Sequence, residues 1–277
     1  MNMVTKNMIK LVHSLELKKN RKRERLFVAE GPKTVGDMIR HYSVHAIFAI
    51  DEWKRQHCDD TKEDIKTSLK WTSNAIGIIT VDEDELRRVS LLQNPQQVVA
   101  LLQIPDDEQD DAANPSKELC IALDGVQDPG NLGTIIRIAD WFGIRHIVCS
   151  PLTADAYNPK TVQATMGSLS NVCVTYRDLD NYISGLSPDT AIYGTLLDGD
   201  DIYTTPLSDK GLIVMGNEGN GISENIRKRV THKLLIPDFN PGKSAESLNV
   251  SIATAIVCSE FRRRNNKSQK KMTLQQC

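Results

Sequence analysis

Apolar positions follow two different spacings in the first hundred residues. Residues 6–19 carry apolar side chains at helical spacing, and a short strand, a Gly-Pro break and a second helix follow over 27–42. Further along, an acid-capped stretch, DEDELRRV, predicts another helix. Runs rich in β-branched residues predict strands at VHAIFAI, AIGIITV and QQVVALLQI. We therefore expect a small α/β domain over residues 1–105.

A steady alternation of strands and helices begins after residue 118. Short apolar runs, separated by helical segments, predict strands at LCIALDGV, HIVCS, VCVTY, AIYGTLL, GLIVMG and KLLIP. Such alternation predicts a parallel sheet covered by helices on both faces. Ligands bind open sheets of this kind beyond the carboxyl ends of the strands, so the turns that follow these strands are the candidate site.

Charge is distributed unevenly along the chain. Residues 106–117 hold five acids in six positions followed by Asn-Pro-Ser, which predicts an acidic linker. The net charge is only −2, yet eight Lys/Arg lie between Lys6 and Glu30, and the tail FRRRNNKSQKK carries six more. From charge alone, these basic runs are either solvated helix faces and frayed ends or surfaces for nucleic-acid phosphate. We expect residues 266–277 to form a disordered basic tail.

The composition indicates a soluble folded protein. The 277 residues are 40% hydrophobic, 25% charged and 5% aromatic, which excludes collagen-like, coiled-coil and wholly disordered classes. Six widely spaced cysteines, without C-x-x-C or a nearby histidine pair, predict free thiols and no metal. The N-terminus lacks the apolar core of a signal peptide, and no run of about 18 apolar residues exists. We therefore expect a cytoplasmic protein without a membrane span.

The first candidate turn lies in DGVQDPGNLGTIIRIADWFGI, residues 124–144. Asn131 can cap a helix that ends at Gly143, a position where glycine commonly follows a helix. Arg137 is a single cation in an otherwise apolar stretch of that helix. It either forms a salt bridge with Asp140, three residues on, or directs its guanidinium at a phosphate or carboxylate of a substrate.

The second and third turns carry different chemistry. In MGNEGNGIS, residues 215–223, the glycine order does not match G-x-G-x-x-G, and the chain has no P-loop motif either. Glu218 would repel phosphate there, so an uncharged or cationic ligand is more natural. In residues 236–256, Ser247 is either the N-cap of a long helix or a functional hydroxyl. Asn249 is a weak helix former, which favours a side-chain role.

Taken together, DGVQDPGNLGTIIR, MGNEGNGI and IP with a downstream SLNVS resemble the three motifs of the SpoU (TrmH-like) RNA ribose methyltransferases of the SPOUT superfamily. The resemblance covers residues 119–262. The first domain, with EGPKTVGDMI after a basic helix, resembles the L30e/L7Ae-like substrate-binding domain found ahead of many such enzymes. One departure is visible, because FNPGKSAES looks longer than the family's loop and leaves the contacts of residues 238–246 open.

The resemblance implies an α/β methyltransferase domain over residues 118–265, threaded as a C-terminal trefoil knot and using S-adenosylmethionine as methyl donor. The donor would lie against the strand-end turns at Thr195, Leu196, Gly216, Ile236 and Leu248. The implied catalytic residues are Asn131, Arg137, Glu218, Ser247 and Asn249. Arg137 would be the central one, as an anchor for the phosphate beside the target ribose or as the general base, and the others would orient it and the ribose.

The function implied is methyl transfer from S-adenosylmethionine to a ribose 2′-hydroxyl of structured RNA, with ribosomal RNA favoured over transfer RNA. One alternative is a catalytically silent RNA-binding protein that keeps the fold, and another is an ordinary nucleotide-binding α/β enzyme, which the missing phosphate fingerprints disfavour. The resemblance also implies a homodimer. The helix SLNVSIATAIVCSEF is apolar over a wide arc, which either faces a second copy or packs within this chain.

Overall fold

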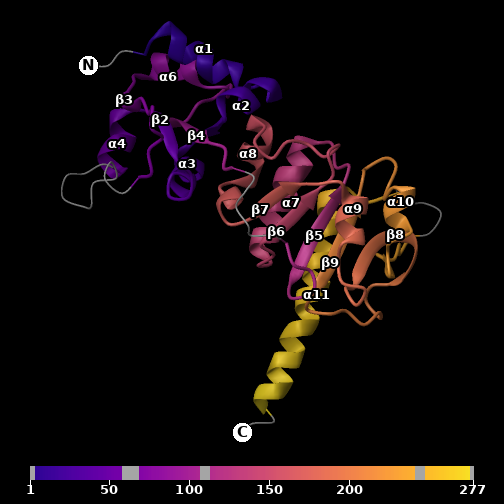
Figure 1. The fold of residues 1–277 in the computed structure, drawn as a ribbon. Coiled ribbons are helices and arrows are strands. Elements are labelled where there is room, and N and C mark those ends of the chain that lie inside the picture. The colour runs from indigo at the N-terminus through magenta and orange to yellow at the C-terminus, as the bar shows by residue number, and fades with distance from the viewer. Residues whose placement is uncertain (1–3, 58–68, 107–112, 241–246, 275–277) are drawn as a thin grey trace. The chain divides into compact units, whose positions relative to one another are not determined.

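The computed structural model describes residues 4–57, 69–106, 113–240 and 247–274, the last ten of these by their backbone alone. The chain forms two compact units, each built from two stretches of sequence. Unit 1 comprises residues 1–109 and 155–170, and unit 2 comprises residues 110–154 and 171–277 (Figure 1).

Unit 1 is built on a four-stranded mixed sheet in the order β1-β4-β2-β3. The strands β1 and β2 run antiparallel to β4, and β3 runs parallel to β2. All the strands predicted before the acidic stretch are present, as β1 (Leu26–Glu30), β2 (Val44–Ala49), β3 (Gly77–Thr80) and β4 (Val98–Gln103). Every residue of β1 and β2 is buried, so both faces of this sheet are covered.

Alternate residues of the sheet pack against different helices. Val28 and Phe48 point into a core shared with Val12 and Leu86, which come from α1 (Lys6–Ser14) and α6 (Glu83–Val89). Phe27 points to the opposite face, where its ring contacts two tyrosines, Tyr42 and Tyr157. That second face is covered by α3 (Pro32–Met38), α8 (Pro159–Thr165) and the short 3-10 helix η1 (Ser168–Ser170). The unit also contains α4 (Asp51–His57).

The single helix predicted over residues 6–19 is wrong, because α1 ends at Ser14 and α2 (Lys18–Glu24) begins separately. Leu17 adopts an extended conformation between the two helices. The carbonyls of residues 14–16 accept hydrogen bonds from the side chains of Asn20 and Arg21, and the Ser14 carbonyl also accepts one from the Leu17 amide. Side-chain donors therefore replace the helical hydrogen bonds that the apolar spacing predicts.

The segment 155–170 packs with unit 1, although its sequence lies inside the expected methyltransferase domain, 118–265. The Tyr42 hydroxyl donates to the Leu169 carbonyl at 2.8 Å, and Arg21 forms an ion pair with Asp155. Contacts thus divide the chain differently from a single cut near residue 105. Half of the expected acidic linker, residues 107–112, lies outside the described residues.

Unit 2 is built on a six-stranded sheet in the order β10-β8-β9-β5-β6-β7, with every pairing parallel. This confirms the predicted α/β class, and the knot, with which the strand order is consistent, stays a prediction. The predicted strands are present as β5 (Leu119–Asp124), β6 (His146–Cys149), β7 (Cys173–Tyr176), β8 (Ile192–Asp201), β9 (Gly211–Gly216) and β10 (His232–Leu235).

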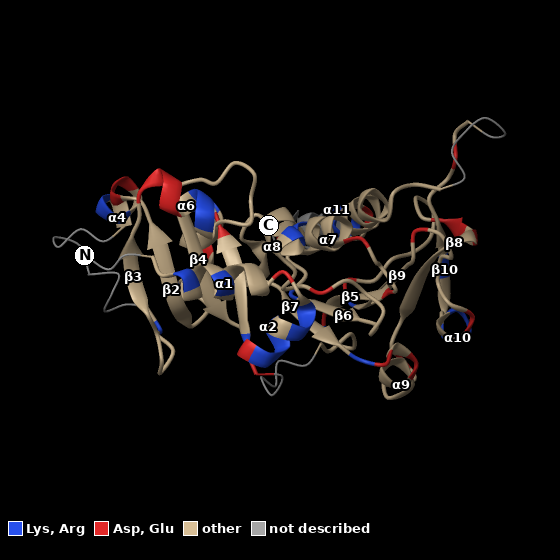
Figure 2. Cartoon of the chain, turned by 90° about the horizontal axis from the view of Figure 1, so that it is seen from above, with Lys and Arg blue, Asp and Glu red and all other residues tan. Residues whose placement is uncertain are grey.

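Helices cover both faces of this sheet. One face carries α7 (Pro129–Trp141) and α11 (Val250–Leu274), which pack on each other, and the opposite face carries α9 (Leu179–Ser184) and α10 (Glu224–Arg227) (Figure 2). Helix α11 takes in most of the expected disordered tail, residues 266–277. That stretch is rich in Lys and Gln, which are good helix formers, so a helix can continue there.

Candidate functional site

Two of the three candidate turns start side by side at the carboxyl ends of adjacent strands. Asp124, the last residue of β5, pairs in register with Gly216, the last residue of β9. The Asp124 carboxylate accepts a hydrogen bond from the Ser223 backbone amide at 2.8 Å, which closes the turn after β9 against β5. The sheet therefore places both turns at one edge, as the motif spacing predicts.

Gly125 fixes the start of the first turn. Its φ of +75° lies in the left-handed region, which glycine adopts without strain. Its amide donates to Ser150 Oγ at 2.9 Å, and its carbonyl accepts from Asn217 Nδ2 at 2.7 Å. Both polar groups of this peptide are thus satisfied by side chains from neighbouring turns.

Asn217 organises the second turn, although it was not predicted as a site residue. Its Oδ1 accepts from the amides of Gly219 and Asn220 at 2.9 and 3.0 Å, while its backbone pairs with Gly221. Gly216 is required just before it, because a Cβ there would lie 2.3 Å from the Gly221 carbonyl carbon. An asparagine among glycines is typical of a turn whose amides are capped by a side chain, and that signal could have identified Asn217.

Three predicted site residues meet in one hydrogen-bonded chain. Asn131 Nδ2 donates to Glu218 Oε1 at 2.9 Å, and Asn249 Nδ2 donates to Asn131 Oδ1 at 3.0 Å. Each residue comes from a different turn, so Asn131 joins the second and third turns to the first. The two amides are consistently oriented as donor and acceptor, which fixes the Glu218 carboxylate on the N-terminal end of α7.

The helix caps differ from those expected. Asp128, not Asn131, caps α7, and its carboxylate accepts from the Asn131 amide at 2.8 Å. Asn249, not Ser247, caps α11, because Asn249 Oδ1 accepts from the amides of Ser251 and Ile252. Both corrections have one reason. The N-cap is the residue whose side chain reaches the first free amides of the helix. Asn131 is thereby left to bind Glu218 and Asn249.

Arg137 is exposed, and it forms no ion pair or hydrogen bond within the described part of the chain. The alternative of a salt bridge to Asp140 is wrong, since Asp140 Oδ2 accepts from Asn171 Nδ2 at 3.3 Å. Arg137 lies six residues after Asn131, roughly 9 Å further along the helix axis. It therefore stands apart from the hydrogen-bonded chain. Ser247 is also exposed and makes no hydrogen bond to another described residue.

Helix α7 is fastened to α11 at both of its own ends. The Asn131–Asn249 hydrogen bond joins their N-terminal ends. Beyond the C-terminal end of α7, Arg262 Nε donates to the Phe142 carbonyl at 2.7 Å, and Arg262 Nη2 donates to the Gly143 carbonyl at 3.0 Å. A cation at these free carbonyls also complements the helix dipole. The helix that carries Arg137 thus has a fixed orientation on α11.

Two predicted donor-binding residues lie where strand β8 leaves the sheet. Its pairing with β10 jumps from Gly194↔Lys233 to Asp200↔Leu234, so residues 195–199 form a bulge. Thr195 Oγ1 donates back to the Val214 carbonyl at 3.2 Å, and Leu196 packs against the core. Because the bulge interrupts the ladder, its backbone can bind a ligand's hydrogen-bonding groups.

An ion cluster holds the outer part of this bulge. Asp198 accepts from Arg227 Nη2 of α10 at 2.6 Å and from Lys233 Nζ of β10 at 2.8 Å. The hydrogen bond from Lys233, with help from Arg227, holds the pKa of Asp198 below its ordinary value. Asp198 was not predicted from the sequence, because its partners lie about thirty residues further along the chain.

A model of the SpoU rRNA methylase family matches residues 118–259, about half of the chain. This chain belongs to the SpoU rRNA methylase family. Residues 6–100 match an MRM3-like substrate-binding domain. Both matches agree with the two resemblances drawn from the sequence, including the substrate-binding character of the N-terminal part.

Relatives and solved structures of the SpoU family resemble the whole chain. The 23S rRNA (guanosine(2553)-2′-O)-methyltransferase RlmP of Bacillus subtilis is 32% identical over 90% of this chain and 93% of its own length. A TrmH-family protein from Porphyromonas gingivalis has a TM-score of 0.79 at 37% identity, covering 95% of this chain and all of that one. An AdoMet-bound rRNA methyltransferase from Sinorhizobium meliloti has a TM-score of 0.78 at 27% identity, covering 95% and 97%.

S-adenosylmethionine is the donor of SpoU methyltransferases, and the residues present here fit it. The bulge at Thr195 and Leu196 offers backbone groups outside the ladder, and Gly216 keeps the neighbouring turn free of a side chain. Ile236 is half-buried and Leu248 is 51% exposed, which leaves apolar surface for an adenine ring. Residues 241–246, in the long loop that the sequence analysis left open, lie outside the described residues.

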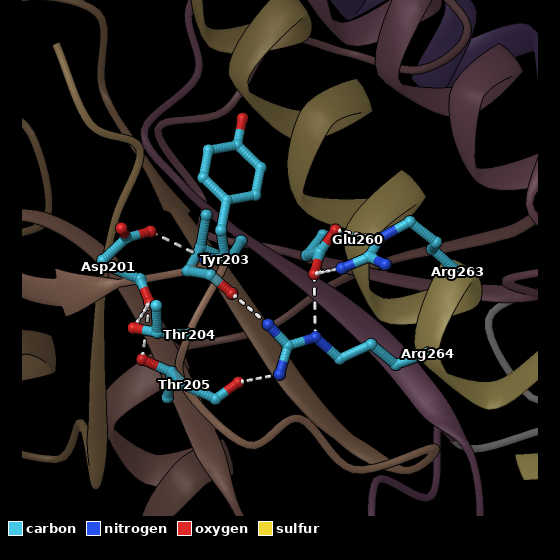
Figure 3. Close-up of polar contacts among 8 residues, drawn as sticks. Asp201, Tyr203, Thr204, Thr205, Glu260, Arg263 and Arg264 are labelled. Atoms are coloured by element: carbon cyan, nitrogen blue, oxygen red, sulfur yellow. Dashed lines mark hydrogen bonds and ion pairs between the residues drawn. The ribbon is translucent and has the colours of Figure 1, made fainter. Parts of the chain in front are cut away.

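A polar network fastens the SpoU domain's last helix to the end of β8. The carboxylate of Glu260, only 4% exposed, accepts hydrogen bonds from Arg263 and Arg264. Arg264 also donates to the carbonyls of Ile202 and Thr205 at 3.0 and 2.6 Å, in the turn after β8 (Figure 3). Helix α11 thereby holds the strand that carries the bulge.

The described residues show no group of His, Cys, Asp and Glu side chains that could hold a metal ion. In the same part of the chain, no helix is both long and apolar enough to cross a bilayer.

Proposed function

We propose that this chain transfers a methyl group from S-adenosylmethionine to a ribose 2′-hydroxyl of 23S ribosomal RNA. The observation that carries the proposal is the hydrogen-bonded chain Glu218–Asn131–Asn249, which joins the three SpoU motifs at one edge of the sheet. The choice of 23S ribosomal RNA over transfer RNA is supported by the RlmP relative, which spans nearly the whole chain.

The reaction divides the work between donor and protein. When bound, S-adenosylmethionine supplies a methyl group activated by its sulfonium. The protein must place the 2′-oxygen in line with that methyl group and assist removal of the hydroxyl proton. Arg137 suits the first task, because it is exposed and has no ion pair or hydrogen bond to a described residue. Its guanidinium can therefore bind the phosphate beside the target ribose through two hydrogen bonds. Its competing role, as general base, requires loss of a proton that arginine normally keeps.

A catalytically silent RNA-binding protein is the alternative function. Asn131, Glu218 and Asn249 are all present and bonded, which favours an active enzyme. Calorimetric titration of the full chain with S-adenosylmethionine, followed by methyl transfer to protein-free 23S ribosomal RNA, separates the two functions. The enzyme binds the donor and labels the RNA, and a silent protein labels nothing.

We further propose that the protein is a homodimer in which Arg137 of one subunit serves the donor bound by the other. Trp141, at the end of α7, is 85% exposed, and Ile252, in the first turn of α11, is 53% exposed. Part of the apolar arc of α11 packs within the chain, since Val257 and Phe261 are fully buried. The exposed remainder is what a second copy would cover.

Light scattering of the full chain at micromolar concentration tests the dimer. The wild type should have twice the chain mass, and Trp141→Ser with Ile252→Ser should shift it toward monomer. Leu152→Ser is the matched control, because Leu152 is 75% exposed in the same unit but lies outside both helices. A monomeric wild type would overturn the proposal.

We place the activity in the cytoplasm, in keeping with the buried thiols of Cys120, Cys149 and Cys258.

A further inference from the structure

Helix α2 breaks the local rules that stabilise a short helix. Its seven residues, KKNRKRE, hold five cations and one acid, and two lysines occupy the first turn, where the helix dipole disfavours positive charge. Leu17, at the N-cap, makes no side-chain hydrogen bond there. A seven-residue helix is marginal even with good caps, so something other than local propensity holds α2.

Two buried polar side chains hold it. Asn20 Nδ2 donates to the Ser14 carbonyl at 2.8 Å, and Arg21 Nη1 donates to the carbonyls of Leu15 and Glu16. Arg21 is 2% exposed and also pairs with Asp155, whose Oδ2 accepts from Nη2 at 2.6 Å and from Nε at 3.1 Å. Breaking such a pair leaves a buried charge uncompensated, so the anchor is strong once formed.

The anchored side of the helix forces the remaining cations outward. Lys18, Lys19, Lys22 and Arg23 are all exposed, and we call these four residues the α2 face. They form two pairs four residues apart, and like charges at that spacing disfavour a helix. In Figure 2, α2 is blue over most of its length. Arg23 Nε forms an ion pair with Glu24 Oε1 at 2.8 Å, and this pair is weak because it is exposed to solvent.

Helix α6 of the same unit shows what a merely solvated helix of this length looks like. It also has seven residues, begins with a capping box between Asp82 and Glu85, and has acids in its first turn and arginines in its last. Arg87 pairs with Asp84 at 3.0 Å within the helix. Every charge on α6 follows the local rules, whereas α2 has two lysines and no acid in its first turn and like charges four residues apart. Such local violations concentrate at functional sites.

We propose that the α2 face binds the phosphate backbone of the RNA substrate, and that the Arg21–Asp155 ion pair holds the face in place for that contact. The inference rests on the proposed function for the identity of the polyanion. A membrane surface is the poorer partner, because a membrane-binding helix needs an apolar side opposite its cations, whereas α2 has Asn20 and Arg21 there. Several lysines on one helix are typical of sequence-independent phosphate contacts.

Binding of protein-free 23S ribosomal RNA to the full chain, measured over a range of salt concentrations, tests the α2 face. Lys19→Gln with Lys22→Gln should lower RNA affinity about tenfold at low salt and reduce the slope of log affinity against log salt by about 1.5. The matched control, Arg87→Gln with Arg88→Gln, removes the same charge from α6 and should leave both quantities unchanged. Equal losses in the two double variants would overturn the proposal.

Asp155→Asn tests the anchor. It removes a negative charge, so charge counting alone predicts tighter RNA binding, whereas loosening of α2 predicts weaker binding. In the wild type, Asp155 Oδ1 accepts a hydrogen bond from the Tyr157 amide, and the asparagine keeps an oxygen that can accept it. Circular dichroism and donor affinity, both expected to be unchanged, show that the variant is folded. RNA affinity equal to or above that of the wild type in a folded variant would overturn the anchoring role.

Methyl transfer and RNA binding by the α2 face can fail separately. If the protein is not an RNA methyltransferase, the wild-type chain does not methylate the RNA, whatever its affinity. If the α2 face does not bind RNA, the wild type methylates the RNA and the α2 variants bind it normally. If both hold, the α2 double variant raises KM for RNA and leaves kcat at saturating RNA unchanged, which a general loss of folded protein would not do.

Discussion

Helices α7 and α2 both present exposed cations, but they are built in opposite ways. Helix α7 has an aspartate cap, a proline in its first turn and a glycine after its end, and it is fastened to α11 at both ends. It presents Arg137, which has no ion pair or hydrogen bond to any residue that the structure describes. Helix α2 has no side-chain cap and presents four cations, and it is held by the buried side chains of Asn20 and Arg21. The difference matches two tasks: chemistry needs one group in a fixed position, and affinity for a polyanion needs many charges.

The largest expected effect comes from substituting Arg137, the cation that α7 presents. Arg137→Ala should lower kcat for methyl transfer by about a thousandfold or more and leave donor affinity unchanged, since the guanidinium is assigned to RNA phosphate. Arg137→Lys should also fail, because a point charge does not reproduce the planar fork. Single-turnover transfer from labelled donor at saturating RNA measures this. Near-normal turnover in Arg137→Ala would remove the residue from the chemistry.

Asn131→Ala tests whether the joined turns matter to that chemistry. It removes the hydrogen bonds from Asn131 to Glu218 and from Asn249 to Asn131 at once. Loss of each bond should lower kcat roughly tenfold, so kcat should fall about a hundredfold. Asn171→Ala is the matched control, because it removes one asparagine hydrogen bond to Asp140, further along the same helix. The control should retain wild-type turnover. Similar kcat values for the two variants would show that the joined turns have no catalytic role.

Asp198→Asn probes the donor side of unit 2. Loss of the ion cluster should loosen residues 195–199 and raise the donor Kd by about three- to tenfold, which calorimetry at low salt can resolve. Asp180→Asn, which removes the exposed pair with Arg229 at 2.9 Å, should leave the Kd unchanged. Because the pKa of Asp198 is lowered, its effect is present above the ordinary Asp pKa and is lost only as pH falls through the lowered value. A wild-type donor Kd in Asp198→Asn would contradict the role of the ion cluster in holding residues 195–199.

The smallest expected effect is on stability. Arg264→Met breaks the contacts from α11 to the turn after β8 and should lower the free energy of unfolding by about 1–3 kcal/mol. Arg263→Met should cost less, because Arg263 is 48% exposed and binds Glu260 alone in the network of Figure 3. Thermal unfolding of both variants side by side checks the order. A larger loss in Arg263→Met would contradict this account of the network.

The strands and the three turns were predictable from the sequence for physical reasons. Buried strands in both sheets read as apolar runs rich in β-branched residues, and each run was found. The resemblance to the SpoU motifs implied a site holding Asn131, Glu218 and Asn249 together with Arg137 and Ser247, and the first three are the ones that the structure joins by hydrogen bonds. The caps could not be assigned from the sequence, because several polar residues compete within a few positions, and only geometry decides that Asp128 and Asn249 reach the free amides.

The break between α1 and α2 was not predicted, because apolar spacing does not show that the Asn20 and Arg21 side chains bind the carbonyls of residues 14–16, and part of this anchor lies far away in the sequence. Arg21 is anchored by Asp155, 134 residues further along the chain. The same distance hides the packing of residues 155–170 on unit 1. A fragment starting near Asn114 would keep that segment and lose its packing partners, so the experiments here use the full chain.

Mapping of 2′-O-methyl ribose in ribosomal RNA is the most direct test of the central claim. RNA from cells lacking this protein is compared with RNA from the same cells carrying the wild type or Arg137→Ala. We predict that a 2′-O-methyl mark in 23S ribosomal RNA is absent without the protein, returns with the wild type and does not return with Arg137→Ala. An unchanged 23S methylation map in all three, or a mark lost only from transfer RNA, would contradict the account.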